Sequence, residues 1–445
     1  MNETLLTILG ALIAMVLVFL IIRRPDLGVT FTLASLPIVD LLPEIPLFSS
    51  VVPLLGGVTL VVFLFNSKKD KTKSAPGSSL IFILGILFIA WMFFSSPEAA
   101  WSGKDRNWVF TFIQLWVLLL LSSRLLDTKE KHHTLMWIFS VVAVLSAFVA
   151  IQQGYIAETE QASYGSSGYV DNANAAARYF IVAMIFLTHL RSESKEPFPR
   201  FLMLIGIFIT YLGVFFTVSR TGIVLLFAAQ LMIFFSQSSG RQRLNIIILG
   251  IIGLVLIWLI SENAFRLAGT ILPAVSEGED TMGLRYALWE AAIRMFKERP
   301  VTGVGIGMYR FLVPLYSRDL PFIAGRSIWA HNTYIQILVE TGFVGFILFF
   351  GMFINSLLNF LKAKFPPNDE RTKLVRVWFI IFVVMLIGGL TKSDHADKLT
   401  WAVMGFSVIF ANQSRFLATE PEKQKISQMQ SHKPLPTGWR YRIKE

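Results

Sequence analysis

The stretch HNTYIQILVETGFVGFILFF, residues 331–350, is mostly apolar, and it is about as long as a membrane-spanning helix. It opens with His331 and Asn332, and it carries Glu340 partway along. Histidine is the side chain whose charge changes nearest to neutral pH, so its place at the head of an apolar segment needs a reason. The rest of the chain supplies one.

Composition sets the fold class. The chain of 445 residues is 54% hydrophobic and 16% charged, with a mean hydropathy of +0.60. This is too apolar for a soluble core of that length, and it predicts an all-α, polytopic integral membrane protein, because helices satisfy their own backbone hydrogen bonds in lipid. The absence of cysteine excludes a disulfide framework, a thiolate metal site and a cysteine nucleophile. The net charge of +11 lies mostly in short loops between apolar runs, which argues against nucleic acid as a partner.

Hydropathy predicts about thirteen spans, and twelve fits nearly as well because the second and third are short and interrupted by proline. The first run lacks the basic leader and small-residue cleavage pattern of a signal peptide, so we interpret it as a retained span. The predicted spans are residues 5–22, 27–42, 51–66, 79–95, 107–126, 134–153, 172–190, 201–218, 221–236, 245–260, 332–361, 374–391 and 398–412.

Loop charge orients these spans. Basic residues gather in alternate loops, which the positive-inside rule assigns to the cytoplasm together with the tail 413–445. The polar end of that tail, from residue 418, is expected to be flexible. The basic residues of these loops are Arg23, Arg24, Lys68, Lys69, Lys71, Lys73, Lys129, Lys131, Arg191, Lys195, Arg200, Arg241, Arg243, Lys362, Lys364, Arg371 and Lys373. The segments predicted to face outward are 96–106, 154–171, 219–220, 261–331 and 392–397.

The long outer loop holds an amphipathic helix in LRYALWEAAIRMFKERP, residues 284–300. Arg285 lies at the border of its apolar stripe, beside Trp289, and is a candidate for binding a ligand. Arg294 has Glu290 and Glu298 one turn away on either side, so a surface ion pair explains it.

A glycine-rich segment, TGVGIGMYR, follows this helix at residues 302–310. Glycine-rich turns can cradle phosphate through their backbone N–H groups, but this one lacks the spacing and the preceding strand of a nucleotide-binding motif. A tight turn that returns the loop to the membrane surface explains the glycines at least as well.

Two more arginines are predicted to lie on the outward side. Arg178 follows Asn172 and Asn174, which can cap the start of a span, and Arg220 stands at a sharp reversal between two apolar helices. An ionisable residue at this depth is costly and is therefore a functional candidate, although snorkelling to lipid phosphate is the alternative.

Other polar residues carry weaker signals. Glu340 is predicted to make a contact between helices, and the glycines that follow it are expected to permit close helix packing. The outer loop with Lys392, Asp394, His395 and Asp397 hints at a metal site, but a hydrated turn explains it better. Trp101, Trp108, Tyr164 and Tyr169 fit interfacial belts or stacking against sugar rings.

The outward face thus offers up to three arginines and one histidine without a cage of carboxylates. Guanidinium groups suit bidentate contact with phosphate oxygens, and a neutral histidine can take a proton from a hydroxyl. This set describes transfer from a diphosphate leaving group to an alcohol. Because ATP is absent outside the cell, the donor must already carry an activated bond.

Three motifs in order resemble the O-antigen ligase and O-antigen polymerase superfamily. They are R-x-x-L-W-x-x-A at 285–292, P-x-T-G-V-G-x-G at 300–307 and H-N-x(9)-G-x-x-G at 331–345, and Ser219-Arg220-Thr221-Gly222 matches the S-R-x-G element that precedes them in this family. The resemblance covers roughly residues 165–360, whereas the first 150 residues match only as apolar spans.

The resemblance implies an enzyme that takes a glycan from undecaprenyl diphosphate and moves it to an acceptor hydroxyl with inversion, without metal, nucleotide or cofactor. By it, Arg220 and Arg285 hold the donor diphosphate, Arg178 is a third contact, and His331 is the base. Asn332 orients the imidazole or caps the helix, and Trp289 and Asn174 support the site. The acceptor is lipid A–core in a ligase and a second lipid-linked glycan in a polymerase.

The same reading divides the chain into four parts: N-terminal transmembrane helices in 1–150, a ligase-like core in 151–361 with its outer loop 261–331, C-terminal helices in 362–412 and the basic tail 413–445. It implies the bacterial cytoplasmic membrane, with the active site facing outward. The competing hypothesis is a lipid-linked oligosaccharide flippase. A transporter lines a central path with charges on several spans, whereas the ionisable residues here gather on one face.

Overall fold

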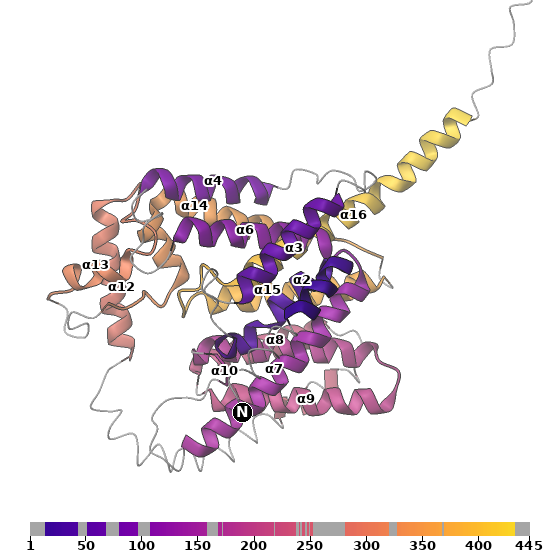
Figure 1. The fold of residues 1–445 in the computed structure, drawn as a ribbon, viewed down its shortest axis with the longest axis horizontal. Coiled ribbons are helices and arrows are strands. Elements are labelled where there is room, and N and C mark those ends of the chain that lie inside the picture. Colours follow the sequence, from indigo (N-terminus) through magenta and orange to yellow (C-terminus); the bar gives the residue numbers. More distant parts are fainter. Residues whose placement is uncertain are drawn as a thin grey trace, which may run out of the picture.

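The computed structural model describes residues 14–42, 51–67, 80–96, 107–157, 168–170, 172–217, 219–236, parts of 240–251, 281–319, 327–366 and 369–431. Within these ranges the secondary structure is helical and contains no strand, which confirms the all-α prediction (Figure 1). The named elements are α2 (Asp26–Ala34), η1 (Leu36–Leu41), α3 (Val51–Ser67), α4 (Leu80–Ser95), α6 (Trp108–Leu125), α7 (Lys129–Ala157), α8 (Ala173–Glu193), α9 (Pro197–Phe216), α10 (Arg220–Ser236), α12 (Thr281–Glu298), α13 (Tyr309–Tyr316), α14 (Thr333–Lys362), α15 (Glu370–Gly388) and α16 (Lys398–Ser431).

The apolar helices make this a multi-pass membrane protein. In the described part of the chain, five helices are long and apolar enough to cross a bilayer: Trp108–Leu125, Lys129–Gln153, Ala173–Glu193, Pro197–Phe216 and Thr333–Lys362. Shorter apolar helices match further predicted spans; they are Ala14–Arg23, Val52–Asn66, Leu80–Ser95 and Arg220–Ser236.

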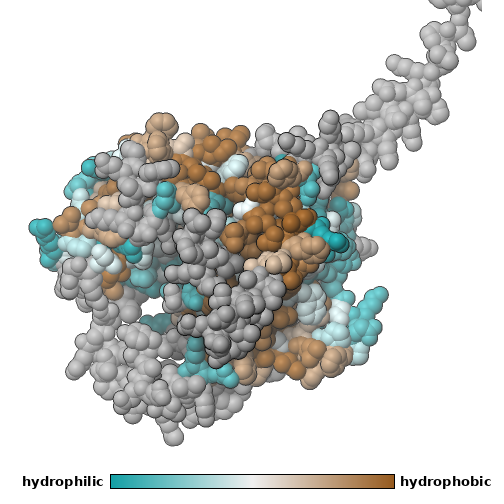
Figure 2. Space-filling model, in the orientation of Figure 1, coloured by the Kyte–Doolittle hydropathy of each residue, from teal (hydrophilic) through white to brown (hydrophobic). Residues whose placement is uncertain are grey.

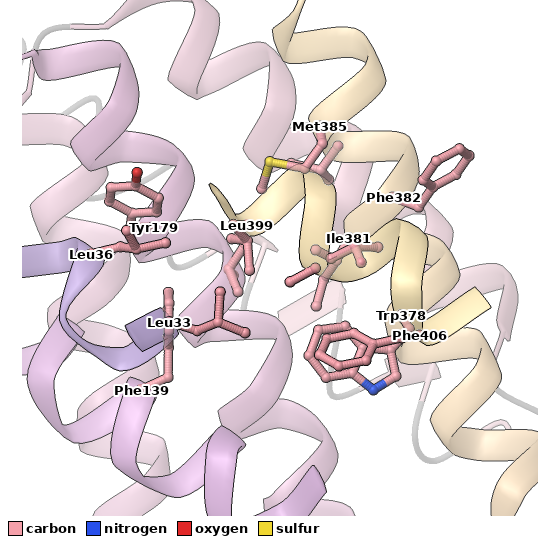
Figure 3. Packing of buried hydrophobic residues seen from close by; sticks show 14 of the residues in the cluster. Leu33, Leu36, Phe139, Tyr179, Trp378, Ile381, Phe382, Met385, Leu399 and Phe406 are labelled. Carbon is pink, nitrogen blue, oxygen red and sulfur yellow. The ribbon is translucent and has the colours of Figure 1, made fainter. Parts of the chain in front are cut away.

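Helix α8 is the innermost of these spans. Of its most apolar window, 83% is buried inside the protein, because α7, α9, α10 and α15 pack around it. The core continues from there into η1, α15 and α16 (Figure 3). Its labelled members come from six elements and fill the space between them: Leu33, Leu36, Phe139, Tyr179, Trp378, Ile381, Phe382, Met385, Leu399 and Phe406.

The outer surface is apolar, as expected of helices that face lipid. Large hydrophobic side chains are exposed on several helices, among them Phe65 on α3, Phe94 on α4, Phe198 on α9 and Phe235 on α10. Figure 2 shows hydrophobic residues gathered over a broad area of the visible face. In water these side chains would cost free energy, whereas hydrocarbon tails accept them.

Two predicted spans and the predicted tail do not match the described structure in full. The expected span 27–42 is wrong as a single helix, because the chain turns at Ser35 and Pro37 opens the separate 3₁₀ helix η1. The expected span 245–260 lies mainly outside the described residues. The tail from residue 418 was expected to be flexible; as far as Ser431 it continues α16 as a helix, and residues 432–445 lie outside the described residues.

The two ends of the helix bundle have different polar contacts. At one end, Glu193 of α8 pairs with Lys129 of α7 and Lys373 of α15, so that three helices meet in one ion-pair network. At the opposite end lie the N-termini of α8, α10 and α14. Helices α12 and α13 lie across one end of α4, α6 and α14 (Figure 1).

Helix α14 is broken where the glycine-rich segment meets it. Gly342 has a φ of 66°, and the N–H of Phe343 donates to the carbonyl of Pro300 at 2.8 Å. A Cβ placed on Gly342 would lie 2.1 Å from the carbonyl oxygen of Val301, so only glycine fits this approach. The prediction of close helix packing holds for Gly345, where an added Cβ would lie 3.0 Å from the Trp91 side chain of α4, whereas Gly342 makes its close approach to a loop.

Candidate functional site

His331 lies immediately before α14, half-buried, in a left-handed backbone conformation with a φ of 49°. Such a φ is uncommon outside glycine and costs free energy that the surrounding structure has to supply. The next residue provides part of the support. Asn332 is the N-cap of α14, and its Oδ1 accepts hydrogen bonds from the N–H groups of Tyr334 at 2.9 Å and Ile335 at 3.1 Å. Of the two predicted roles for Asn332, the structure therefore shows the cap.

The other side of His331 is held by α12. The indole Nε1 of Trp289 donates a 3.0 Å hydrogen bond to the carbonyl of Ala330, the residue before the histidine. A small separate core that includes Leu288, Met295 and Val339 fixes α12 against α14. Trp289 thus acts as a brace for the backbone that carries His331.

Two cations set the charge around His331. Burial first, and then the positive charges of Arg285 and Lys392, lower the pKa of the imidazole below its ordinary value of 6.5. The arrangement keeps the ring neutral at pH 7. A neutral imidazole is the form that accepts a proton.

The loop of residues 389–397 is tied to the first turn of α14. The N–H of Thr333 donates to the carbonyl of Gly389 at 2.8 Å, and its hydroxyl donates to the carbonyl of Lys392 at 2.7 Å. The same hydroxyl oxygen accepts the N–H of Asp394 at 2.8 Å. This loop and the histidine therefore share one anchor.

Asp394 joins two of the cations. Its carboxylate contacts the Nζ of Lys392 at 3.0 Å and forms an ion pair with Arg178 of α8. Arg178 was predicted to be a third contact to the donor. The structure places it in the interior, with 3% of its side chain exposed, and its Nε and Nη1 have no hydrogen-bond partner among the described residues. A donor can reach this guanidinium only if the pair with Asp394 opens.

Arg220 stands at the first position of α10 and is exposed. Ser219 fixes this helix start, because its hydroxyl oxygen accepts the N–H of Gly222 at 2.8 Å. The Ser219 hydroxyl also donates to Oδ1 of Asn174 at 2.5 Å, which joins the starts of α8 and α10. Asn174 was predicted to support the site; it contacts Ser219, the residue before Arg220.

The four arginines singled out in the sequence fall into two groups. Arg178 is paired with Asp394, and Arg294 is paired with Glu290 and Asp319, so the predicted ion pair of Arg294 is present with a second partner from outside its helix. Arg220 and Arg285 have no carboxylate partner among the residues that the structure describes. These two are the arginines with charge available to a ligand.

The glycine-rich segment uses its backbone donors internally. The N–H groups of Val304 and Gly305 donate to the carbonyls of Val339 and Glu340, both at 2.9 Å. These groups cannot cradle a phosphate at the same time, and the tight-turn interpretation holds for this part. Glu340 is buried and its Oε1 accepts from Gln336 at 3.0 Å. The same Oε1 accepts the N–H of Tyr309, the first residue of α13, at 3.3 Å, so the predicted contact between helices is present.

The loop residues that hinted at a metal have other partners. Asp397 caps α16 by accepting the N–H of Thr400 at 2.8 Å, and the ring of His395 is buried against Trp108 and Phe112. Trp108 is itself buried, so it is not exposed for stacking on a sugar. Trp101 and Tyr164 lie outside the described residues.

Sequence reasoning missed an aromatic and cationic pair beside the site. The guanidinium of Arg310 lies over the indole of Trp329, 4.6 Å from the ring centroid, two residues before His331. It also underrated Asp394. A signal existed for both, since each lies in a polar segment that the sequence predicts to face outward, but the partners are distant in sequence.

Comparison with known proteins agrees with this arrangement. Residues 205–350 match the family model described as O-Antigen ligase. This segment, residues 205–350, is therefore similar to an O-antigen ligase domain. It is also 23% identical over 370 residues to an uncharacterized protein of Haemophilus influenzae (strain Rd), which covers 80% of this chain and 90% of that protein. The resemblance drawn from the motifs is confirmed at the level of the family.

The O-antigen ligase domain contains Arg220, Arg285, Trp289 and His331, together with the glycine-rich segment. Asn174, Arg178 and Asp394 lie outside it. Asn174 contacts Ser219 and Asp394 contacts Thr333, both within the matched segment, and Arg178 pairs with Asp394. The domain supports a membrane glycosyltransferase of the O-antigen ligase and polymerase type.

Proposed function

We propose that this protein transfers a glycan from undecaprenyl diphosphate to an acceptor hydroxyl, either on lipid A–core or on a second lipid-linked glycan. The observation that carries the proposal is the position of His331 at the N-terminus of α14, half-buried, where burial and then the charges of Arg285 and Lys392 lower its pKa. A base that is neutral at pH 7 next to an available guanidinium suits an acceptor alcohol and an anionic leaving group.

In the proposed step, the acceptor oxygen attacks the anomeric carbon of the donor sugar from the face opposite the diphosphate. The bond between that carbon and the diphosphate oxygen breaks as the new glycosidic bond forms, and the configuration inverts. His331 takes the proton of the hydroxyl, and undecaprenyl diphosphate leaves with the electron pair. The step balances without an added oxidant or nucleotide.

Arg220 and Arg285 are proposed to hold the diphosphate. Planar guanidinium groups bind phosphate oxygens through paired N–H donors, and they stabilise the negative charge that grows as the sugar departs. The carboxylates of the 389–397 loop already have partners in the protein. Asp394 binds Arg178 and Lys392, and Asp397 binds Thr400. This supports a site that works with arginines in the place of a metal.

The orientation is likewise a proposal. The end of the bundle with Glu193, Lys129 and Lys373 carries the basic loops that the positive-inside rule assigns to the cytoplasm. His331, Arg220 and the 389–397 loop lie at the other end, which we assign to the outward face. Lipid-linked donors would reach Arg220 along the apolar surface of α10.

The test is a transfer assay with purified protein and an undecaprenyl-diphosphate oligosaccharide, in EDTA, with and without lipid A–core. Longer lipid-linked chains from the donor alone identify a polymerase. A product that forms only with the second acceptor identifies a ligase. A control ligase shows that each donor preparation can be used. If this protein forms neither product from the same donors, the proposed function is wrong.

A further inference from the structure

A cavity lies at the end of the bundle opposite His331. It measures about 170 Å³ and opens between α8, α10 and α15, near the last turns of α8 and α10 and the first turns of α15. One water needs roughly 15 Å³ by the same measure, so the space is far larger than a hydration site. It is smaller than the pockets that enclose whole drug-sized ligands, which favours a headgroup.

Two cations of α15 stand at this cavity, and only one has a carboxylate. Lys373 pairs with Glu193, which also binds Lys129 at 3.1 Å, and Lys129 has Glu370 as a second carboxylate partner at 2.6 Å. Arg376 donates from Nη1 to the carbonyl of Ser236 at 3.0 Å and has no carboxylate partner among the described residues. The rim therefore carries a net positive charge.

His189 adds a buried donor or acceptor without a partner. Its side chain lines the cavity, 7% of the residue is exposed, and its Nε2 makes no hydrogen bond within the described structure. A buried polar atom of this kind costs free energy unless something else satisfies it. A bound polar ligand would remove that cost.

The hydroxyls of the cavity point to the chemistry of that ligand. Thr188 donates to the carbonyl of Met184 at 2.8 Å, and Ser236 donates to the carbonyl of Ile233 at 2.7 Å. Their protons are used, so their oxygens remain as acceptors. The complementary ligand carries both an anion for the cations and hydroxyl donors for these oxygens.

We propose that this cavity binds the headgroup of phosphatidylglycerol from the leaflet at this end of the protein. The phosphate would contact Lys373 and Arg376, and the glycerol hydroxyls would donate to Thr188 and Ser236. The acyl chains would lie on the exposed apolar face of α10, where Phe235 is 69% exposed. Basic pockets between transmembrane helices are a recognised way of binding anionic headgroups.

Zwitterionic lipids fit less well. The choline group of phosphatidylcholine is a cation that cannot donate a hydrogen bond, and it would lie near the positive charge of Arg376. The ammonium group of phosphatidylethanolamine would have to compete for Glu193 with Lys129 and Lys373, which already bind it. The proposal is independent of the transfer chemistry, because its site lies at the other end of the molecule.

Native mass spectrometry of the full-length protein tests the proposal, with phosphatidylglycerol, phosphatidylethanolamine and phosphatidylcholine of the same acyl chains. The wild type is expected to retain phosphatidylglycerol selectively. The double variant Lys373→Gln/Arg376→Gln is expected to bind phosphatidylglycerol about tenfold more weakly, or weaker still, because each substitution removes a charged hydrogen bond. Lys362→Gln/Lys364→Gln removes the same charge from exposed positions outside the cavity and should bind like the wild type.

A second variant, Ser192→Leu, narrows the rim without changing charge and should also lower retention of phosphatidylglycerol. Equal retention of all three lipids, or equal loss in both double variants, would overturn the proposal. Inorganic phosphate serves as a further probe in a thermal-shift assay. If it stabilises the protein as much as the lipid does, the ligand is a free anion and the lipid assignment is wrong.

Discussion

At the scale of single residues, the proposed site depends on arginines that have no carboxylate partner among the described residues. Asp394 forms ion pairs with Arg178 and Lys392, and Asp319 and Glu290 form ion pairs with Arg294. Removing an arginine that already has carboxylates changes little for a ligand, whereas removing one without them takes away a binding group. This difference separates functional arginines from structural ones.

The first prediction compares these arginines. Arg220→Gln and Arg285→Gln should each weaken donor binding and lower kcat/KM by about tenfold to 100-fold, the effect of one hydrogen bond to a charged group. Arg294→Gln, on the same helix as Arg285, is the matched control and should behave like the wild type. The measurement is donor affinity together with kcat/KM. Equal effects in all three variants would show that net charge, not position, matters.

The second prediction concerns pH. Lys392 is one of the cations that lower the pKa of His331, so the imidazole stays neutral to a lower pH than usual. Lys392→Gln removes that charge, which raises the pKa and makes protonation easier. The acid limb of the pH–rate profile should therefore move to higher pH, while the rate on the alkaline plateau stays similar. A limb that does not move would show that His331 is not the titrating base.

The residues most visible in the sequence were those that stand in local motifs. His331, Arg220 and Arg285 each carry a signal within a few positions. The link from Arg178 through Asp394 to the site was not predictable, because it depends on how α8 and the 389–397 loop meet in space. Burial and ion pairing decide between a binding arginine and a structural one, and neither is a property of a short stretch.

At the scale of elements, the break in α14 connects the glycine-rich segment to the helix that begins at the histidine. Thr333–Lys362 agrees with the predicted 332–361 within one residue, because a long apolar run fixes its own ends. The kink at Gly342 was not predicted, since it arises from the approach of residues 300–305. The failed prediction of a single span over 27–42 has a similar origin, because short segments with proline follow tertiary contacts.

The third prediction tests this break. In Gly342→Ala the new Cβ would lie 2.1 Å from the carbonyl oxygen of Val301, at a φ that side chains avoid. We expect a loss of about 2–5 kcal/mol of stability, the sum of backbone strain and overpacking. Gly57→Ala on α3 meets nothing within 4 Å and should be neutral. Thermal unfolding in detergent measures both, and similar melting of the two variants would contradict the account of the kink.

At the scale of the whole molecule, the two ends of the helix bundle carry different sets of charged residues. The glycan-transfer site is proposed at the His331 end, and the ion-pair network of Glu193 lies at the other. Composition alone predicted the all-α membrane fold, because apolar runs leave no other solution in lipid. The arrangement of helices around α8 was not predictable, since hydropathy says which segments enter the membrane and not which neighbours they choose.

The fourth prediction uses the absence of cysteine, which makes single-cysteine labelling straightforward. Ser327→Cys, exposed and close to His331, should react with a membrane-impermeant maleimide in intact cells. Lys362→Cys, exposed at the end of α14, should react only after the membrane is opened. Labelling of both positions from the same side would refute the assignment of the two ends to two sides.

The central claim is that His331 is the base of a transfer reaction whose donor is held by other residues. The most direct measurement is donor binding and turnover in the same preparation of His331→Ala. The account predicts that turnover falls by at least about 100-fold, the contribution of a general base, while donor affinity is unchanged. Turnover equal to the wild type, or a loss of donor binding as large as the loss of turnover, would contradict it.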